Sequence, residues 1–258
     1  MNVLAIGDVV GSRGCEFLKE KLPKIKTDYK VDLTIANGEN SAEGNGITIA
    51  SAEFLLHSGI DVITSGNHAF KRRESRGVYK NNKNVIRPAN YPEDTTPGKG
   101  YCYINVNGIE VLVINILGTT FLESLRSPHE TIDGILNRNN NRAKIIILDL
   151  HAEATAEKRA LGFYLDGKIS AIFGTHTHVQ TSDECILENG TGYITDVGMT
   201  GTIRSVLGIE PEIIIKRMLT HLPEKFICAQ GPQKIECVLF TIDDNTGKTV
   251  SVKRLRIV

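Results

Sequence analysis

The sequence has no excess of charge of either sign and no paired cysteine motif. Lysine plus arginine and aspartate plus glutamate each number 30, so the formal net charge is zero. This balance gives no support to a broad nucleic-acid or membrane surface, although a local basic patch stays open. The cysteines are odd in number and lack a Cys-x-x-Cys spacing, so we expect free thiols in a reducing compartment. They are Cys15, Cys102, Cys185, Cys228 and Cys237.

Long apolar runs are also missing. Runs such as Ile145 to Leu148 are far too short to span a bilayer, so we expect no membrane partner. Asp8 interrupts the N-terminal stretch before a signal-peptide core could form, which predicts a cytoplasmic protein. No linker, repeat or low-complexity segment divides the chain, and its length supports one large core. We therefore expect a single domain over residues 1–258.

Three common nucleotide and hydrolase motifs are absent. The chain contains neither Gly-x-x-x-x-Gly-Lys-Ser/Thr nor Gly-x-Ser-x-Gly, so P-loop and α/β-hydrolase chemistry have no support. A dinucleotide-binding interpretation of Gly7 to Gly14 also fails, because Val9 stands where the second glycine of that motif is needed.

The patterns that are present predict an α/β protein. Short aliphatic runs alternate with helical periodicity in the first half of the chain, and hairpin patterns dominate the second. Asn107-Gly108 between two such runs is a strong type I′ hairpin signal. This order favours layers with a mixed sheet over a purely parallel arrangement. We expect strands at 3–6, 32–36, 61–65, 101–106, 110–116, 144–150, 170–173, 184–187, 193–195, 234–242 and 249–257, and helices at 12–26, about 49–56, 129–137, 155–165 and 209–221.

The most informative stretch is Gly174-Thr175-His176-Thr177-His178, which follows an apolar run from Ile169 to Phe173. On an extended backbone, two histidines at i and i+2 point the same way and can serve one metal ion or two adjacent ones. Neutral imidazole is a common ligand for zinc, iron and manganese. An isolated pair of this kind is weak evidence, so the rest of the chain has to support it.

Other expected strands also end in ligand-type residues. Each has a plain structural alternative: Asp8 could cap the following helix, Asn67 could be a turn residue, and His151 could be a hydrogen-bonded core histidine. Ligands gather at the carboxyl ends of strands in open α/β sheets. One shared site therefore explains the polar residues at five strand-to-loop junctions better than five separate structural roles do. The candidate ligands are Asp8, Glu39, Asn40, Asn67, His151, His176 and His178.

These seven oxygen and nitrogen ligands exceed what one tetrahedral ion needs. Two ions about 3.5–4 Å apart and bridged by a carboxylate would use them all, which is the geometry of metal-assisted phosphoester hydrolysis. No cysteine lies near these positions, so a structural zinc site closed by thiolates is disfavoured.

The motifs together resemble the YmdB-like branch of the calcineurin-like metallophosphoesterases. The matching stretches are Gly7-Asp8-Val9-Val10-Gly11, Asn37-Gly38-Glu39-Asn40, Gly66-Asn67-His68-Ala69-Phe70, His151-Ala152-Glu153-Ala154-Thr155, Gly174-Thr175-His176-Thr177-His178 and Asp196-Val197-Gly198-Met199-Thr200-Gly201. The resemblance covers essentially the whole chain. It implies a four-layer α/β-β-α sandwich with mixed β-sheets around two metal ions.

The resemblance also implies a ligand assignment. Metal one takes Asp8, Glu39, Asn40 and His178, and metal two takes Glu39, Asn67, His151 and His176, with Glu39 bridging. The sequence has Asp8-Val9-Val10 where the wider superfamily has Asp-x-His, and Glu39-Asn40 where most relatives carry an aspartate pair. Both departures are normal for this branch. They leave the first site richer in oxygen, which favours iron or manganese over zinc or magnesium.

By resemblance, the expected activity is a phosphodiesterase acting on cyclic nucleotides, including 2′,3′-cyclic ones, or on RNA ends. A metal-activated hydroxide attacks phosphorus, and His68, which follows Asn67 and has no metal in this assignment, protonates the leaving oxygen. A homo-oligomer is expected as well. The alternatives are a phosphomonoesterase or protein phosphatase on the same metals, and a nucleotide- or RNA-binding regulator with a vestigial site.

Two further segments stay ambiguous. Lys71-Arg72-Arg73 and Arg76 could meet phosphate, but a solvated helix face is the favoured interpretation. Gly198-Met199-Thr200-Gly201 is interpreted as a flexible loop bordering the site or as a plain turn.

Overall fold

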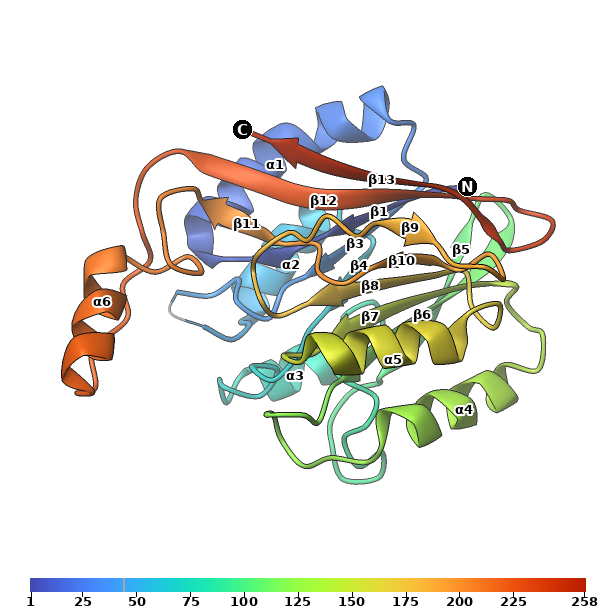
Figure 1. The fold of residues 1–258 in the computed structure, drawn as a ribbon, viewed down its shortest axis with the longest axis horizontal. Helices are drawn as coiled ribbons and strands as arrows, with labels where there is room; N and C mark the ends of the chain where they lie inside the picture. The colour runs from blue at the N-terminus through green and yellow to red at the C-terminus, as the bar shows by residue number, and fades with distance from the viewer. Residues whose placement is uncertain (44) are drawn as a thin grey trace.

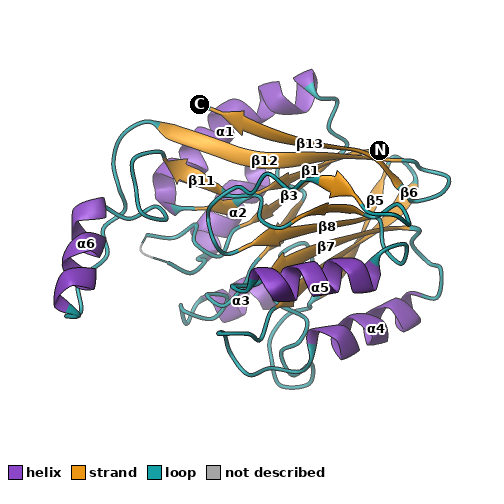
Figure 2. Cartoon of the chain, viewed as in Figure 1, coloured by secondary structure: helices purple, strands orange, loops and turns teal. Residues whose placement is uncertain are grey.

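Two β-sheets lie face to face at the centre of the protein, and helices cover the outer face of each (Figure 1, Figure 2). The computed structural model describes residues 1–43 and 45–258. The result is a four-layer α/β-β-α sandwich, as the family resemblance implied, and both sheets mix parallel and antiparallel pairs.

The first sheet has seven strands in the order β2-β11-β12-β1-β3-β4, and β13 also pairs with β12. β1 pairs in parallel with β3, and β3 with β4, whereas β12 is antiparallel to β1. The strands are β1 (Asn2–Ile6), β2 (Asp8–Val9), β3 (Leu33–Asn37), β4 (Val62–Thr64), β11 (Met199–Thr202), β12 (Gln233–Ile242) and β13 (Thr249–Ile257).

The second sheet has six strands in the order β5-β6-β7-β8-β10-β9. β6, β7, β8 and β10 are parallel, and each outer strand is antiparallel to its neighbour. The strands are β5 (Tyr101–Val106), β6 (Ile109–Leu117), β7 (Ile145–His151), β8 (Ala171–Thr175), β9 (Cys185–Ile186) and β10 (Gly192–Ile194).

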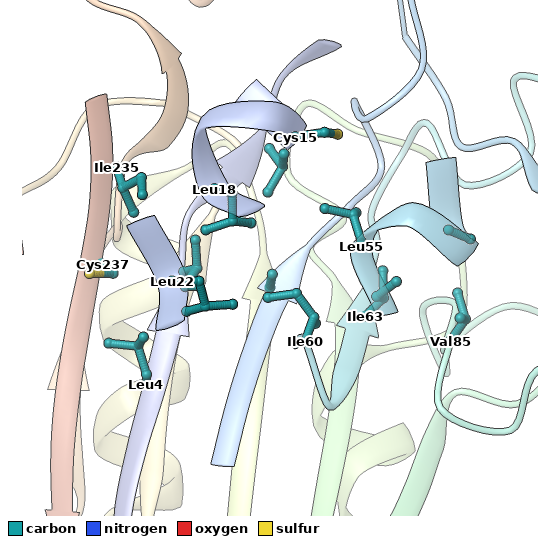
Figure 3. Close-up of a cluster of buried hydrophobic side chains, with 14 of the residues drawn as sticks. Leu4, Cys15, Leu18, Leu22, Leu55, Ile60, Ile63, Val85, Ile235 and Cys237 are labelled. Carbon is teal, nitrogen blue, oxygen red and sulfur yellow. The ribbon is translucent and has the colours of Figure 1, made fainter. Parts of the chain in front are cut away.

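The alternation of side chains along each strand builds the core. In β1, Val3 and Ala5 face the second sheet, whereas Leu4 and Ile6 face the helices. α1 (Gly11–Asp28), α2 (Ile49–His57) and α3 (Ser75–Asn81) cover the first sheet, and α4 (Pro128–Asn139) and α5 (Thr155–Leu165) cover the second. Figure 3 shows Leu18 and Leu22 of α1 pointing into the first of these helix–sheet contacts.

One helix does not join a layer. α6 (Pro211–Thr220) lies between β11 and β12 in the chain and extends away from both sheets (Figure 1). It has no buried residue, although its sequence is rich in apolar side chains. Nothing in the amphipathic pattern distinguishes such a helix from one that covers a sheet, so only the fold reveals it.

Most expected elements are present, and the predicted Asn107-Gly108 turn has positive φ at both residues, 52° and 87°, as a type I′ turn requires. One interpretation is wrong, and another holds only in part. Met199–Thr202 is strand β11 rather than a loop or turn, because it pairs with both β2 and β12. The basic run 71–73 precedes α3 in a turn, where Arg72 donates hydrogen bonds to the carbonyl oxygens of Glu43 and Asn45, whereas Arg76 is exposed in α3 as the helix-face interpretation predicted.

Among the described residues, no helix combines the length and apolar character needed to cross a membrane.

Candidate metal centre

The carboxyl ends of five strands meet at one edge of the sandwich and bring all seven predicted ligands into one region. Asp8 lies in β2 and His151 ends β7, and the other five lie in the loops that follow β3, β4 and β8. The two sheets touch here, because Asn37 at the end of β3 places its Nδ2 3.2 Å from His151 Nδ1. The loop positions are Glu39, Asn40, Asn67, His176 and His178.

One group of ligand atoms surrounds the His151 ring, whose side chain is fully buried. His151 Nε2 lies 2.9 Å from Asn67 Oδ1, 3.2 Å from Glu39 Oε1 and 3.1 Å from His176 Nδ1. Ligand atoms of Glu39, His151 and His176 all lie within 4.8 Å of one another, which is close enough to hold a metal ion.

A second group lies beside Asp8. His178 Nε2 is 3.6 Å from Asp8 Oδ1 and 3.3 Å from the Asn40 side-chain nitrogen. Asp8 Oδ2 accepts the His176 backbone N–H at 3.1 Å, but Asp8 Oδ1 has no hydrogen-bond partner within the described part of the chain. An unpaired oxygen on a fully buried carboxylate is costly, and a cation would satisfy it.

Hydrogen bonds on the Nδ1 side of the ring, away from the other ligands, fix the orientation of His151. Its Nδ1 lies 2.9 Å from Thr175 Oγ1, and that hydroxyl donates to Asp149 Oδ1 at 2.7 Å. Because the Thr175 proton is used on Asp149, the Thr175 oxygen accepts from Nδ1–H. Nε2 then faces the site with a free lone pair, which is the arrangement that ligating histidines show in metalloproteins.

The other two histidines are held in the same way. His176 Nε2 lies 2.8 Å from Glu153 Oε2, so its Nδ1 is the nitrogen facing the site. His178 Nδ1 donates to the Leu207 carbonyl oxygen at 3.1 Å, so its Nε2 faces Asp8. In their neutral forms, all three rings therefore present lone pairs to the same region, alongside two carboxylates. This set of donors fits divalent or trivalent cations of the iron, manganese and zinc type.

The pKa values of the buried carboxyl and imidazole groups also favour a site for cations. Burial favours the neutral form of Asp8 and Glu39, yet positive charge on His178 and His151 outweighs it and lowers the pKa of both carboxyl groups. Burial also disfavours charge on His151, but Glu39, Asp8 and Asp149 reverse this and raise its pKa to about 9. Nearby positive charge thus stabilises the buried carboxylates. Protons on the histidines supply this charge when metal ions do not.

Glycine at position 66 allows the His151 ring to approach the backbone. A Cβ atom at Gly66 would lie 2.1 Å from the His151 ring, a distance that no side chain tolerates. The Gly66-Asn67 turn therefore places Asn67 Oδ1 beside His151 Nε2 only because residue 66 has no side chain.

His68 borders the same region but is not one of the three histidines whose lone pairs face it. Its backbone N–H donates to Glu39 Oε2 at 2.8 Å, and its Nδ1 lies 2.8 Å from Asn40 Oδ1. The half-buried ring lines an open cleft of about 930 Å³ whose floor also includes His176 and His178. Burial lowers the pKa of His68 below its ordinary value, and the Glu39 charge offsets this only in part.

The two histidines of the His-x-His motif do not lie on an extended backbone, so the predicted parallel orientation of their side chains is wrong. β8 ends at Thr175, and His176 and His178 both have positive φ, 101° and 61°. Their rings diverge, one towards His151 and the other towards Asp8. The motif thus serves two adjacent positions by a twisted backbone rather than by strand alternation.

Comparison with known proteins places the chain in a family. The model of the YmdB-like protein family matches residues 4–255. The chain belongs to the YmdB-like metallophosphoesterases. It is 49% identical over 257 residues to the 2′,3′-cyclic-nucleotide 2′-phosphodiesterase of Bacillus subtilis, and the match covers 100% of this chain and 97% of that protein.

Two crystal structures of similar proteins share the whole architecture. A hypothetical protein from Thermus thermophilus is 40% identical with a TM-score of 0.93, covering 100% of this chain and 99% of that one. A novel phosphatase from Mycoplasma pneumoniae is 32% identical with a TM-score of 0.93, covering 100% and 93%.

In this member of the YmdB-like family, the residues that sequence reasoning missed lie behind the ligands. Glu153 is two residues after His151, and Asp149 is two residues before it in the buried strand β7. A carboxylate inside a fully buried strand was a usable signal, because buried charges need partners. The carbonyl oxygen of Leu207 carried no signal, since backbone atoms are present at every position.

Proposed function

We propose that this protein is a two-metal phosphodiesterase that hydrolyses 2′,3′-cyclic nucleotides. The observation that carries the proposal is the convergence of lone pairs from three histidines on two buried carboxylates, one of which has an unpartnered oxygen, at the floor of a cleft. Its support from comparison is the 49% identity to a 2′,3′-cyclic-nucleotide 2′-phosphodiesterase.

The proposed ligands divide into two sets. We place Glu39 in both, because its Oε1 lies 3.2 Å from His151 Nε2 and its Oε2 accepts the backbone N–H of His68, whose ring contacts Asn40. We assign Asp8, Glu39, Asn40 and His178 to one ion, and Glu39, Asn67, His151 and His176 to the other. When bound, the two cations would supply positive charge to phosphate oxygens and lower the pKa of a water molecule.

The amide orientation of Asn40 decides what His68 can do. With Oδ1 beside His68, as in the structure, Nδ1 donates and Nε2 carries a lone pair. Coordination by Asn40 requires the amide to turn by 180° so that its oxygen replaces the nitrogen now beside His178. The Asn40 nitrogen then donates to His68 Nδ1, and the ring proton moves to Nε2. The two orientations exchange only the amide oxygen and nitrogen, so both fit the same atom positions.

This second state is the one a general acid needs. Among the described contacts of His68, none involves Nε2, and the ring lines the cleft. We infer that Nε2–H gives its proton to the leaving oxygen of the diester as the phosphorus–oxygen bond breaks. Binding of a metal ion to the Asn40 oxygen would thus set the tautomer of the acid beside it.

The test is hydrolysis of adenosine 2′,3′-cyclic phosphate by chelator-stripped protein, with manganese or ferrous iron added back. We expect turnover to return with metal and to yield the 3′-monophosphate. Lack of turnover with either ion, in protein shown by elemental analysis to contain metal, would contradict the proposal.

A second candidate is a phosphomonoesterase, favoured by the similarity to the Mycoplasma phosphatase. Relative rates on a 2′,3′-cyclic diester and on the corresponding 3′-monoester separate the two. Cys15, Cys102 and Cys237 are free thiols buried in the core. We infer that the protein works in a reducing compartment such as the cytoplasm.

A further inference from the structure

The segment 203–232 between β11 and β12, called the excursion below, is held together by its own contacts. Lys216 of α6 forms a 2.6 Å ion pair with Glu224, and the Arg217 guanidinium lies 5.1 Å from the centre of the Phe226 ring. An isolated β-bridge joins Ile209 to Cys228 at its base. Figure 2 shows the helix of this excursion standing clear of the four layers.

The excursion forms one wall of the cleft whose floor is the candidate metal centre. Glu39, His68, His176 and His178 line the floor, and the wall is lined by Leu207, Ile214, Arg217, Met218, His221 and Phe226. The wall is tied to the floor, because the Leu207 carbonyl oxygen accepts from His178 Nδ1. A substrate whose phosphate lies on the floor therefore has this wall beside the rest of its structure.

The chemistry of the wall is unusual for a solvent-exposed surface. Met218 is 69% exposed, Leu207 47% and Phe226 37%. All three line the cleft, and exposed apolar side chains gathered at a cleft mark a binding site. Apolar side chains next to an arginine suit the flat face of a nucleobase, which binds by stacking and cation–π contact.

We propose that the wall formed by Leu207, Ile214, Met218 and Phe226 binds the base of the substrate nucleotide. This inference rests on the proposed function and adds a subsite to it. Contact through a flat face does not depend on the edge of the base, so the subsite accepts all four bases and favours purines for their larger area.

The test compares two diesters that share the reacting ring. One is adenosine 2′,3′-cyclic phosphate, and the other is 1-O-methylribose 2′,3′-cyclic phosphate, which has no base. We expect Met218→Ala to lower kcat/KM for the nucleotide by about tenfold, mainly through KM, because the base loses apolar contact with Met218, and to leave the abasic diester unchanged. Leu219→Ala is the matched control, because Leu219 is adjacent and 78% exposed but does not line the cleft.

Each other outcome has a defined meaning. Equal losses on both diesters, or no loss on either, would overturn the subsite. Joint loss of an oligomer in Met218→Ala and Leu219→Ala, measured by light scattering, would make the wall an interface between copies and overturn it too. If the wild-type protein turns over neither diester, calorimetric binding of adenosine 2′,3′-cyclic phosphate decides: weaker binding by Met218→Ala supports the subsite while the proposed function fails, and unchanged or absent binding overturns the subsite.

Discussion

Lys158 Nζ lies 2.8 Å from Asp196 Oδ2, and the two side chains are 1% and 0% exposed. The same lysine donates to the Thr175 carbonyl oxygen at 2.8 Å, and the same carboxylate accepts from the Thr177 backbone N–H at 3.1 Å. This buried pair therefore holds the turn that carries His176. It connects α5 to the candidate metal centre without touching the ligands themselves.

Removal of the lysine should destabilise the fold strongly. Lys158→Met leaves Asp196 buried without its counter-charge, and such losses cost about 3–5 kcal/mol. Urea unfolding monitored by circular dichroism measures the change. The double variant Lys158→Met/Asp196→Asn should recover part of the loss, because it removes the orphaned charge. A loss below about 1 kcal/mol would show that the pair behaves like a surface ion pair.

Gly66→Ala should disturb both stability and metal content. The new Cβ would overlap the His151 ring, so we expect a loss of about 1–3 kcal/mol from overpacking and a lower metal content by elemental analysis. Gly134→Ala is the matched control, because its Cβ meets nothing within 4 Å in helix α4. That control should gain about 0.5–1 kcal/mol. Equal behaviour of the two variants would refute the steric argument.

The ligand assignment predicts different metal contents for different variants. Glu39→Gln removes the proposed bridge and should abolish binding of both ions. His176→Ala and His178→Ala should each lower the content from about two ions per chain to about one, because they belong to separate sets. Elemental analysis after dialysis is the measurement, and His57→Ala on the exposed face of α2 is the control. A parallel loss of both ions in all three variants would reject the division.

Glu153 should act on metal affinity through His176. Glu153→Gln weakens the 2.8 Å contact that fixes the His176 ring, and losses of this kind typically weaken metal binding about 10–100-fold. Competition with a chromogenic chelator reports the affinity without requiring turnover. Glu188→Gln, an exposed carboxylate in the turn after β9, provides the comparison. Unchanged affinity in Glu153→Gln would mean that the loop alone orients His176.

His68→Ala should separate catalysis from binding. We expect turnover of the cyclic nucleotide to fall about 10²–10⁴-fold, the usual worth of a general acid, while metal content stays the same. Loss of metal together with activity would move His68 into the ligand shell. A substrate with a leaving group of low pKa, which needs no proton, should recover most of the rate.

Much of the layered fold was readable from the sequence because most elements carry a local signal. Strand β7 is a continuous buried run, and Asn107-Gly108 forms the predicted turn. Strand β11 was missed because its four residues, Met199–Thr202, contain a glycine and two threonines and owe their conformation to pairing with two distant strands.

The candidate ligands were also readable, because acidic, amide and imidazole groups at the ends of strands are distinct from the apolar runs before them. Local patterns in the chain thus specify which residues can serve as ligands and in what order they come. Their orientation depends on the folded chain: the positive φ of His176 and His178, Glu153 behind one ring, and the Leu207 carbonyl behind the other. These contacts join residues far apart in the chain, and one of the partners, the Leu207 carbonyl oxygen, is a backbone atom. No local pattern in the sequence therefore encodes them.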